Sequence, residues 1–288
     1  MLGSGTTVSN GGSTNSITVT GGDVYIHSNS AAALVGNGGA GAFKLTTPAG
    51  KFVNIVGGTN WQAGPIPPNV RTFQAERSDP LAYVGAPVAP PAWTQKTSNG
   101  WYSSNTTLVS GIYGDFGWGG ATLTLNPGVY GSINSGGVSG TKLVLKAGTY
   151  IVTGNLALNG QTTIETANNG LDEVTLYFTC RTGNAPRTCG ANGELGGKLT
   201  TGGLTQINLR PPATGSLRGM SIFYDRNNTS ELPLNGSTNF STGAIYAKRS
   251  LVNFGSSNIL TSGQLVIGKI ALNSGGKVFA TYDATKLP

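Results

Sequence analysis

The stretch L-T-L-N-P-G-V-Y, Leu123 to Tyr130, is followed further on by L-V-L-K-A-G-T-Y, Leu143 to Tyr150. Both copies follow the pattern L-x-L-x-(P/A)-G-x-Y, and they begin 20 residues apart. A short fixed period is typical of one supersecondary unit that is stacked on its own copy. Alternation along a strand places both leucines of a copy on the same side, so the copies would stack as an aliphatic ladder. The spacing therefore predicts two neighbouring coils of a parallel β-solenoid.

The remainder of the chain uses the same kind of sequence. Short runs of Val, Leu, Ile, Thr and aromatic residues are closed by Gly, Asn, Pro or Ser, which is typical of strands and turns. With 46 glycines and only 10% charged residues, the composition argues against helices. Parallel strand connections are right-handed. We therefore expect an all-β fold, a right-handed parallel β-helix that forms a single domain over residues 1–288.

Two segments interrupt this rhythm. Residues 79–91, D-P-L-A-Y-V-G-A-P-V-A-P-P, are rich in proline and do not alternate. We interpret them as an extended segment, either a linker or a strap laid along the solenoid. Residues 92–120 follow and are rich in aromatic residues and glycine, and we interpret them as an irregular insertion or coil.

Charge and cysteine content limit the partners and the compartment. The net charge of +7 comes without any Lys/Arg cluster longer than two residues, which argues against a nucleic-acid groove. No apolar stretch is long enough to span a membrane. Cys180 and Cys189 are the two cysteines and flank a turn-like segment, so we expect a disulfide and an oxidising compartment. A zinc site is disfavoured, because His27 is the sole histidine.

Several motifs occur in an order that resembles a known family. They are G-G-D-V-Y-I-H-S-N-S, D-P-L-A-Y-V-G-A-P, L-T-L-N-P-G-V-Y, R-G-M-S-I-F-Y-D-R-N-N, G-A-I-Y-A-K-R-S-L-V-N-F-G and S-G-Q-L-V-I-G-K-I-A-L-N-S-G-G. Together they resemble the C-terminal region of TadG-like proteins, of the TadE/TadG family of tight-adherence (Flp) pilus assembly. The resemblance covers about residues 20–274. It implies an exported bacterial protein of the cell surface or pilus that acts in adherence, with pilus or cell-envelope components as partners and without catalytic residues or a cofactor.

The best binding candidates are aromatic. They crowd into eighteen residues of Gly- and Ser-rich sequence, where rings could stack on sugars while Asn and Ser bind the hydroxyls. The alternative is that these rings cap the open end of the solenoid core, since an uncovered edge invites aggregation. The candidate ligand-binding residues are Trp101, Tyr102, Tyr113, Phe116 and Trp118.

Acidic residues are candidates for catalysis because solenoids also carry polysaccharide lyases and hydrolases. Such enzymes require paired carboxylates, or carboxylates for Ca²⁺ beside a base. The adjacent pair Asp172 and Glu173 would point to opposite sides of a strand or belong to a turn. Asp225 and Arg226 end an apolar strand, where they could form a site or a strand-end turn. No catalytic constellation and no metal site is predicted.

The sequence thus predicts a non-enzymatic extracellular protein of the cell surface or Tad pilus that mediates adhesion, with surface glycans as possible ligands and no nucleic-acid partner. Two alternatives stay open. One is a polysaccharide-active β-helix enzyme, which would bring Asp172, Asp225 and a Lys or Arg into one groove. The other is a purely structural pilus subunit.

Overall fold

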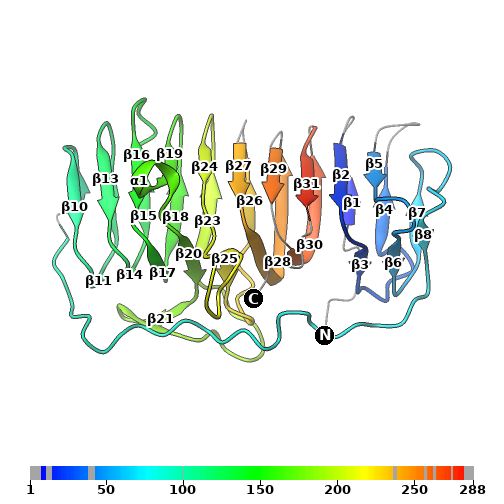
Figure 1. Cartoon of the computed structure of the whole chain (residues 1–288), viewed down its shortest axis with the longest axis horizontal. Helices are drawn as coiled ribbons and strands as arrows, with labels where there is room; N and C mark the ends of the chain where they lie inside the picture. The colour runs from blue at the N-terminus through cyan, green and yellow to red at the C-terminus, as the bar shows by residue number, and fades with distance from the viewer. Residues whose placement is uncertain are drawn as a thin grey trace.

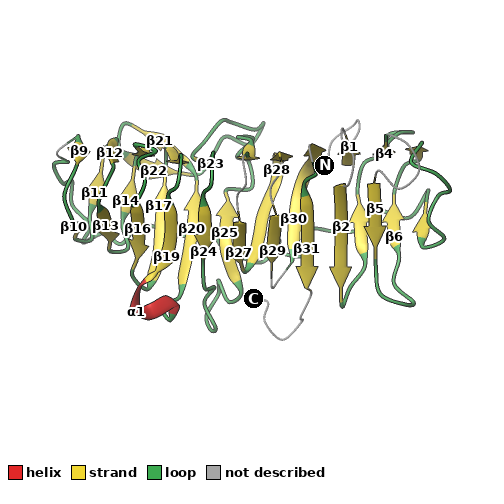
Figure 2. Ribbon diagram, turned by 90° about the horizontal axis from the view of Figure 1, so that it is seen from above, coloured by secondary structure: helices red, strands yellow, loops and turns green. Residues whose placement is uncertain are grey.

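The protein forms an elongated stack of parallel strands. The computed structural model describes residues 8–10, 15–37, 43–98, 100–235, 239–255, 258–261, 264–273 and 275–281. Most turns of the chain contribute three short strands, one to each of three walls, as β13, β14 and β15 do (Figures 1 and 2). The expected all-β, parallel, solenoid-like fold is thereby confirmed.

The first wall is a parallel sheet of ten strands. Its inward side chains are buried and its outward ones are partly exposed, as in Leu143 and Val144, which explains the alternating sequence. In spatial order its strands are β10 (Thr106–Leu108), β13 (Thr122–Leu125), β16 (Lys142–Leu145), β19 (Thr163–Thr166), β24 (Gln206–Asn208), β27 (Asn239–Thr242), β29 (Asn258–Thr261), β31 (Lys277–Thr281), β2 (Asn15–Thr20) and β5 (Phe43–Thr46).

The second and third walls belong largely to one sixteen-stranded sheet, because two long strands, β28 and β30, run across both. The second wall contains β11 (Ile112–Tyr113), β14 (Val129–Tyr130), β17 (Gly148–Val152), β20 (Val174–Phe178), β25 (Met220–Tyr224) and the first parts of β28 (Ala244–Gly255) and β30 (Leu265–Asn273). Within the described residues, it continues without direct pairing as β3 (Val24–Ile26), β6 (Val53–Ile55) and β8 (Val70–Arg71). The third wall contains β9 (Trp101–Tyr102), β12 (Phe116–Trp118), β15 (Ile133–Ser135), β18 (Asn155–Leu158), β23 (Lys198–Thr201), β26 (Leu232–Leu234), the second parts of β28 and β30, β1 (Val8–Asn10), β4 (Leu34–Gly36) and β7 (Thr59–Trp61).

The repeated motif occupies equivalent positions in successive coils. Leu123 pairs with Leu143, and Leu125 with Leu145, as the spacing predicted. Ile164 continues the same column in the next coil. All five side chains are buried in one continuous core, so the period of the sequence is the period of the core.

The motif tyrosines form a second column at the corner that follows the leucines. Tyr130 stacks on Tyr150 with ring centroids 6.1 Å apart, and on Tyr113 at 5.4 Å. Each hydroxyl donates a hydrogen bond to a carbonyl four residues earlier in its own coil, so a buried phenol keeps a polar partner. These bonds run from Tyr113 to Val109, from Tyr130 to Asn126 and from Tyr150 to Lys146.

The spatial order of the coils differs from their order in the sequence. β31 pairs with β2, and β30 pairs with β1, so the first and last described strands meet in the middle of the stack. From there the N-terminal coils build outward to β8 at one end. Residues 75–94, which we call the strap, then run along the second wall to the opposite end, where Gln95 bridges to Ile112 (Figure 1).

The strap explains why strands of the second wall are apolar on both sides. Their inward residues join the inner core, whereas outward residues such as Tyr177, Phe223 and Tyr246 pack with Leu81 and Val84 of the strap in a separate cluster. Strands that are covered on both faces are expected to lose alternation. The runs V-T-L-Y-F of β20 and M-S-I-F-Y of β25 are accordingly buried at every position.

Two irregular regions complete the fold. Residues 101–118 form β9 to β12, a coil at one end of the stack, which is one of the two alternatives expected for residues 92–120. Its V-S-G-I-Y segment is a third, divergent copy of the corner motif. α1 (Ala167–Gly170) is a single turn between β19 and β20, in which Asn168 and Asn169 have positive φ (Figure 2).

We expect the strap to be held by its buried leucine. Leu81→Ala should lower the free energy of unfolding by about 2–5 kcal/mol, since it opens a cavity between the strap and the second wall. Leu81 is 2% exposed, whereas Val88 in the same strap is 85% exposed. Val88→Ala is therefore the matched control and should have almost no effect in urea unfolding. Equal effects of the two substitutions would contradict a packed strap.

The strap is also held by a carboxylate. Asp79 accepts hydrogen bonds from the Tyr246 hydroxyl at 2.7 Å and from Lys248 at 3.2 Å. Burial raises the pKa of the Asp79 carboxyl, but the hydrogen bonds from Tyr246 and the Leu81 N–H and the charge of Lys248 outweigh it, so the pKa lies below the ordinary 3.8. The ionised form is therefore favoured by folding, and its contribution is complete above pH 3.8 and is lost as the pH falls through the lowered pKa.

Asp79→Asn should consequently destabilise the protein at pH 7 by about 1.5–3 kcal/mol, because hydrogen bonds to a charged group are lost. The difference between the variant and the wild type should shrink as the pH is lowered below 3.8, where the wild-type carboxylate also becomes neutral. Denaturant unfolding across a pH series measures this difference. A difference that stays constant down to pH 2 would show that the charge of Asp79 is not what holds the strap.

Candidate functional site

Four of the five candidate aromatic side chains lie in the inner core. Tyr102, Tyr113, Phe116 and Trp118 are at most 6% exposed. Tyr102 packs edge-on against Phe116 at 5.6 Å, and Phe116 in turn packs against Tyr113. They fill the end of the core, as in the alternative interpretation, because the inward positions of a strand are buried. The structure therefore departs from a binding face made of five rings.

Trp101 is the remaining candidate and lies on the surface, with 49% of its area exposed. It belongs to β9, the terminal strand of the third wall, where it pairs with Gly117 of β12. Its indole rests on a shelf of three glycines, Gly117, Gly119 and Gly136. A methyl group added at Gly117 or Gly136 would come within 2.5 or 2.8 Å of the ring. One face of the indole is thus fixed on backbone, and the opposite face is open to solvent.

An ion pair lies at the corner that precedes β12, the strand that pairs with β9. Asp115, directly before β12, forms a bidentate ion pair with Arg181, with Nη1 2.8 Å from Oδ1, and it accepts the Ser132 N–H. The hydrogen bond from Arg181 is the main cause that holds the pKa of the Asp115 carboxyl below its ordinary value. The corner before β12 therefore carries an ionised carboxylate paired with a guanidinium at ordinary pH. The Trp101 indole itself, a planar ring fixed on one face, is suited to stack on a sugar ring or a similar flat ligand.

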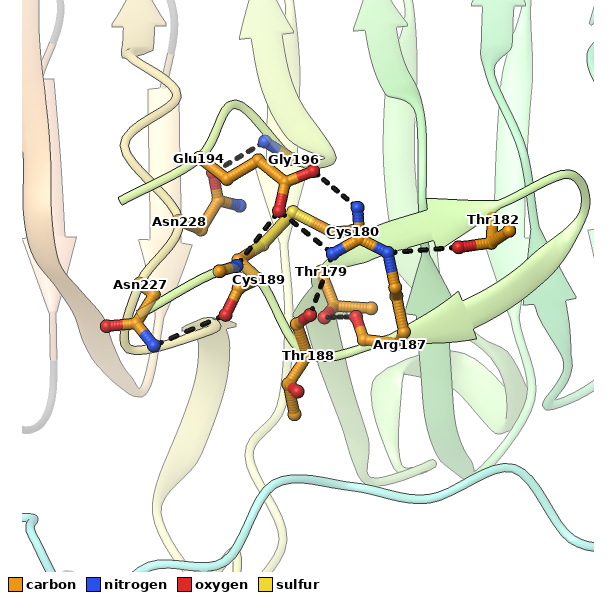
Figure 3. A network of polar contacts seen from close by, with 11 residues as sticks. Thr179, Cys180, Thr182, Arg187, Thr188, Cys189, Glu194, Gly196, Asn227 and Asn228 are labelled. Atoms are coloured by element: carbon orange, nitrogen blue, oxygen red, sulfur yellow. Dashed lines mark hydrogen bonds and ion pairs between the residues drawn. A yellow bond between two sulfur atoms is a disulfide. The ribbon is translucent and has the colours of Figure 1, made fainter. Parts of the chain in front are cut away.

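Arg181 is positioned by a disulfide-bonded hairpin. β21 (Cys180–Thr182) and β22 (Ala185–Arg187) pair antiparallel, and Cys180 and Cys189 are joined with their Cα atoms 5.0 Å apart. This is the disulfide that the sequence predicted. Figure 3 shows the polar contacts that surround it.

The base of this hairpin is fixed by an ion pair. The Glu194 carboxylate accepts hydrogen bonds from both terminal nitrogens of Arg187 and from the Gly190 N–H. The hydrogen bond from Arg187 is the largest cause that lowers the pKa of the Glu194 carboxyl to about 2. Asn227 donates to the Cys189 carbonyl, which ties the hairpin to the turn after β25 (Figure 3). These contacts hold the loop in place and occupy the Glu194 carboxylate.

The two acidic candidates for catalysis lie at opposite ends of neighbouring strands. Asp172 precedes β20, where it accepts the Ala147 N–H and the Asn168 amide, as expected of a turn residue. Asp225 follows β25, is buried, and accepts the Tyr177 hydroxyl at 2.8 Å and the Asn227 N–H. Because β20 and β25 run parallel, the two carboxylates do not converge on one groove. They do not form the arrangement that the enzyme hypothesis requires.

The sequence did not predict whether Arg226 has a structural or a functional role, nor what His27 contacts. Arg226 donates to the Leu81 carbonyl and thereby ties the strap to the second wall, which is a structural role. His27 directly follows β3 and lines a cavity beside that strand. Its Nδ1 is buried and has no hydrogen-bond partner among the described residues. Within the same part of the chain, no three acidic, His or Cys side chains lie close enough to hold a metal ion.

The glycine shelf is the part of the site that sequence reasoning missed. Its signal is the segment D-F-G-W-G-G, residues 115–120, in which glycines alternate with inward aromatic residues. Glycine at outward positions of a strand marks a close approach by another group. Here that group is the Trp101 indole from the adjacent strand.

Comparison with known proteins adds no relative. No family model matches the chain, and no curated protein or solved structure matches it. None of the helices in the described residues has the length and apolar character needed to cross a membrane.

Removing the disulfide should loosen the Arg181 hairpin more than the solenoid. The double variant Cys180→Ser/Cys189→Ser should lose about 2–3 kcal/mol, the value that loop-closure entropy gives for a bridge of this span. Urea unfolding with and without a reductant measures it, and the double variant should not respond to the reductant. A wild-type protein whose stability is the same in both conditions would contradict this contribution.

Proposed function

We propose that this protein is a non-enzymatic extracellular protein of the bacterial cell surface or Tad pilus and that it mediates adhesion by binding surface glycans. The fold is proposed to be a right-handed parallel β-helix. The TadG-like order of the sequence motifs supports the assignment to tight adherence, with pilus or cell-envelope components as partners. The disulfide supports an oxidising compartment, where such bridges persist.

The observation that carries the proposal is the fixed Trp101 indole. A ring that is already held on the glycine shelf loses little conformational freedom when a ligand stacks on its open face. Asp115, directly before the adjacent strand β12, is paired with Arg181 and adds a charged group to the same end coil. The ring lies at the end strand of the wall, where an elongated body would present it away from an attachment surface.

The test is retention of the full chain on immobilised acidic and neutral surface glycans across a salt series. Stacking on an indole depends little on ionic strength, whereas attraction between the +7 chain and acidic glycans is screened by salt. We therefore expect retention that persists at high salt and falls about tenfold or more in Trp101→Ala, which corresponds to about 1.4 kcal/mol.

Two further variants sharpen this experiment. Gly136→Ala keeps the indole but pushes it off its shelf, and should also weaken retention. Tyr83→Ala removes another exposed aromatic ring, on the strap, and is the matched control that should bind as the wild type does. Released oligosaccharide would instead favour a polysaccharide-active enzyme. If the chain is not retained and no oligosaccharide is released, the adhesin proposal is overturned and a structural pilus subunit is favoured.

A further inference from the structure

The outer face of the three-stranded sheet of β3, β6 and β8 carries one row of polar side chains. The strands pair in parallel, so Tyr25, Asn54 and Arg71 lie side by side at equivalent positions. Their neighbours along the strands, such as Ile26 and Ile55, belong to the inner core, so the side chains of the row point outward. The row lies toward the end of the stack opposite to β9 (Figure 2).

Two guanidinium groups lie on aromatic rings at this face. The Arg71 Cζ lies 3.2 Å from the centroid of the Phe52 ring, and the Arg77 Cζ, from the start of the strap, lies 4.1 Å from the centroid of the Tyr25 ring. Attraction to the rings holds both groups in place. In the described part of the chain, neither arginine forms an ion pair or donates a side-chain hydrogen bond. Their N–H donors are therefore positioned but not used.

A carboxylate lies beside the two arginines and is occupied by the chain itself. Asp23 accepts the Phe52 N–H at 2.7 Å through Oδ1 and the Tyr25 hydroxyl at 3.4 Å through Oδ2. Asp23 thereby positions the two residues whose rings carry the guanidinium groups. Two guanidinium groups against one carboxylate leave these residues with a net charge of about +1 at neutral pH.

The same residues line a cavity of about 410 Å³. Its volume lies within the range of about 300–1,000 Å³ that is typical of small-ligand sites. Asn54 and Gln74 add side-chain amides to the lining, and amides both donate to and accept from hydroxyl groups. A guanidinium fork matches the geometry of a carboxylate. A single excess positive charge suits the monoanion of a sugar carboxylate better than a phosphate monoester, whose charge is about −1.5 to −2.

We propose that this cavity binds an acidic sugar unit, whose carboxylate is bound by Arg71 and Arg77 and whose hydroxyl groups are bound by Asn54 and Gln74. Recognition here depends on charge and on hydrogen bonds, whereas the Trp101 indole offers a ring for stacking. The cavity and the indole lie toward opposite ends of the stack, so binding at the cavity does not depend on the adhesion proposed for Trp101 (Figure 2).

The experiment measures the binding of fluorescein-labelled trigalacturonate to the full chain by fluorescence anisotropy. The trimethyl ester of this probe has the same sugar rings without their charges. It should bind at least about tenfold more weakly, because the hydrogen bonds to a charged group are lost. Binding of the acid should also weaken as the salt concentration rises, since exposed charges are screened. Inorganic phosphate at the concentration of the probe should not displace it.

Three protein variants and a control locate the binding. Arg71→Gln and Arg77→Gln each remove one guanidinium and should each weaken binding about tenfold or more. Arg71→Lys keeps the charge but loses the planar fork, so it should also bind more weakly than the wild type. Lys44→Gln is the matched control and should bind as the wild type does. Lys44 is likewise exposed, lies at the same end of the stack on β5 of the first wall, and its substitution changes the net charge equally.

Four outcomes would overturn the proposal. Equal binding of the acid and the ester would show that no carboxylate is recognised, and equal loss in Arg71→Gln and Lys44→Gln would show that only the net charge matters. Displacement of the probe by inorganic phosphate would make phosphate the ligand. Loss of probe binding in Trp101→Ala would place the acidic sugar at the indole. Arg71→Gln should leave retention on neutral glycans unchanged, so a failure of this proposal is distinguishable from a failure of the adhesin proposal.

Discussion

Register between successive coils is the constraint on which the whole structure depends. Each inward position lies beside its equivalent in the next coil, so Leu123, Leu143, Ile164 and Ile207 form one column of the core. A shift by one residue would turn every inward side chain to the outside. Corner geometry prevents this shift, because each motif tyrosine is bonded to a carbonyl four residues earlier and stacks on the tyrosine of the adjacent coil. The aliphatic ladder and the tyrosine column therefore fix each other.

The same constraint accounts for what the sequence could and could not predict. Period and alternation were sufficient for the parallel, solenoid-like fold and for the Leu123–Leu143 pairing, because both are local properties of the strands. The sequence did not show which aromatic side chains of the cluster face the core. Trp101 and Trp118 occur in similar Gly-rich sequence and differ only in the direction of their side chains. Inside the core, main-chain carbonyls accept hydrogen bonds from the hydroxyls of Tyr113 and Tyr130, so these side chains are buried without losing a polar partner.

Coil order was beyond sequence reasoning for a physical reason. In a solenoid every coil presents nearly the same edge, so the N-S-I-T-V-T strand β2 could pair with any similar strand. Neither the sequence of β2 nor that of β31 alone predicts that these two strands pair. The strap is what makes this arrangement consistent. It covers the outward apolar residues of the second wall and returns the chain to the end where β9 and β10 begin. Tyr177, Phe223 and Tyr246 point outward from the second wall, and they are buried because the strap covers them.

A stack that is built from both ends of one chain has a level where its two parts meet, and that level is held differently in each wall. The first and third walls close it with direct pairing, β31 to β2 and β30 to β1. In the second wall the strap crosses the level, and its Asp79 bonds to the side chains of Tyr246 and Lys248 in β28. Within the described residues, the two halves of the stack are thus joined by two walls and by the strap.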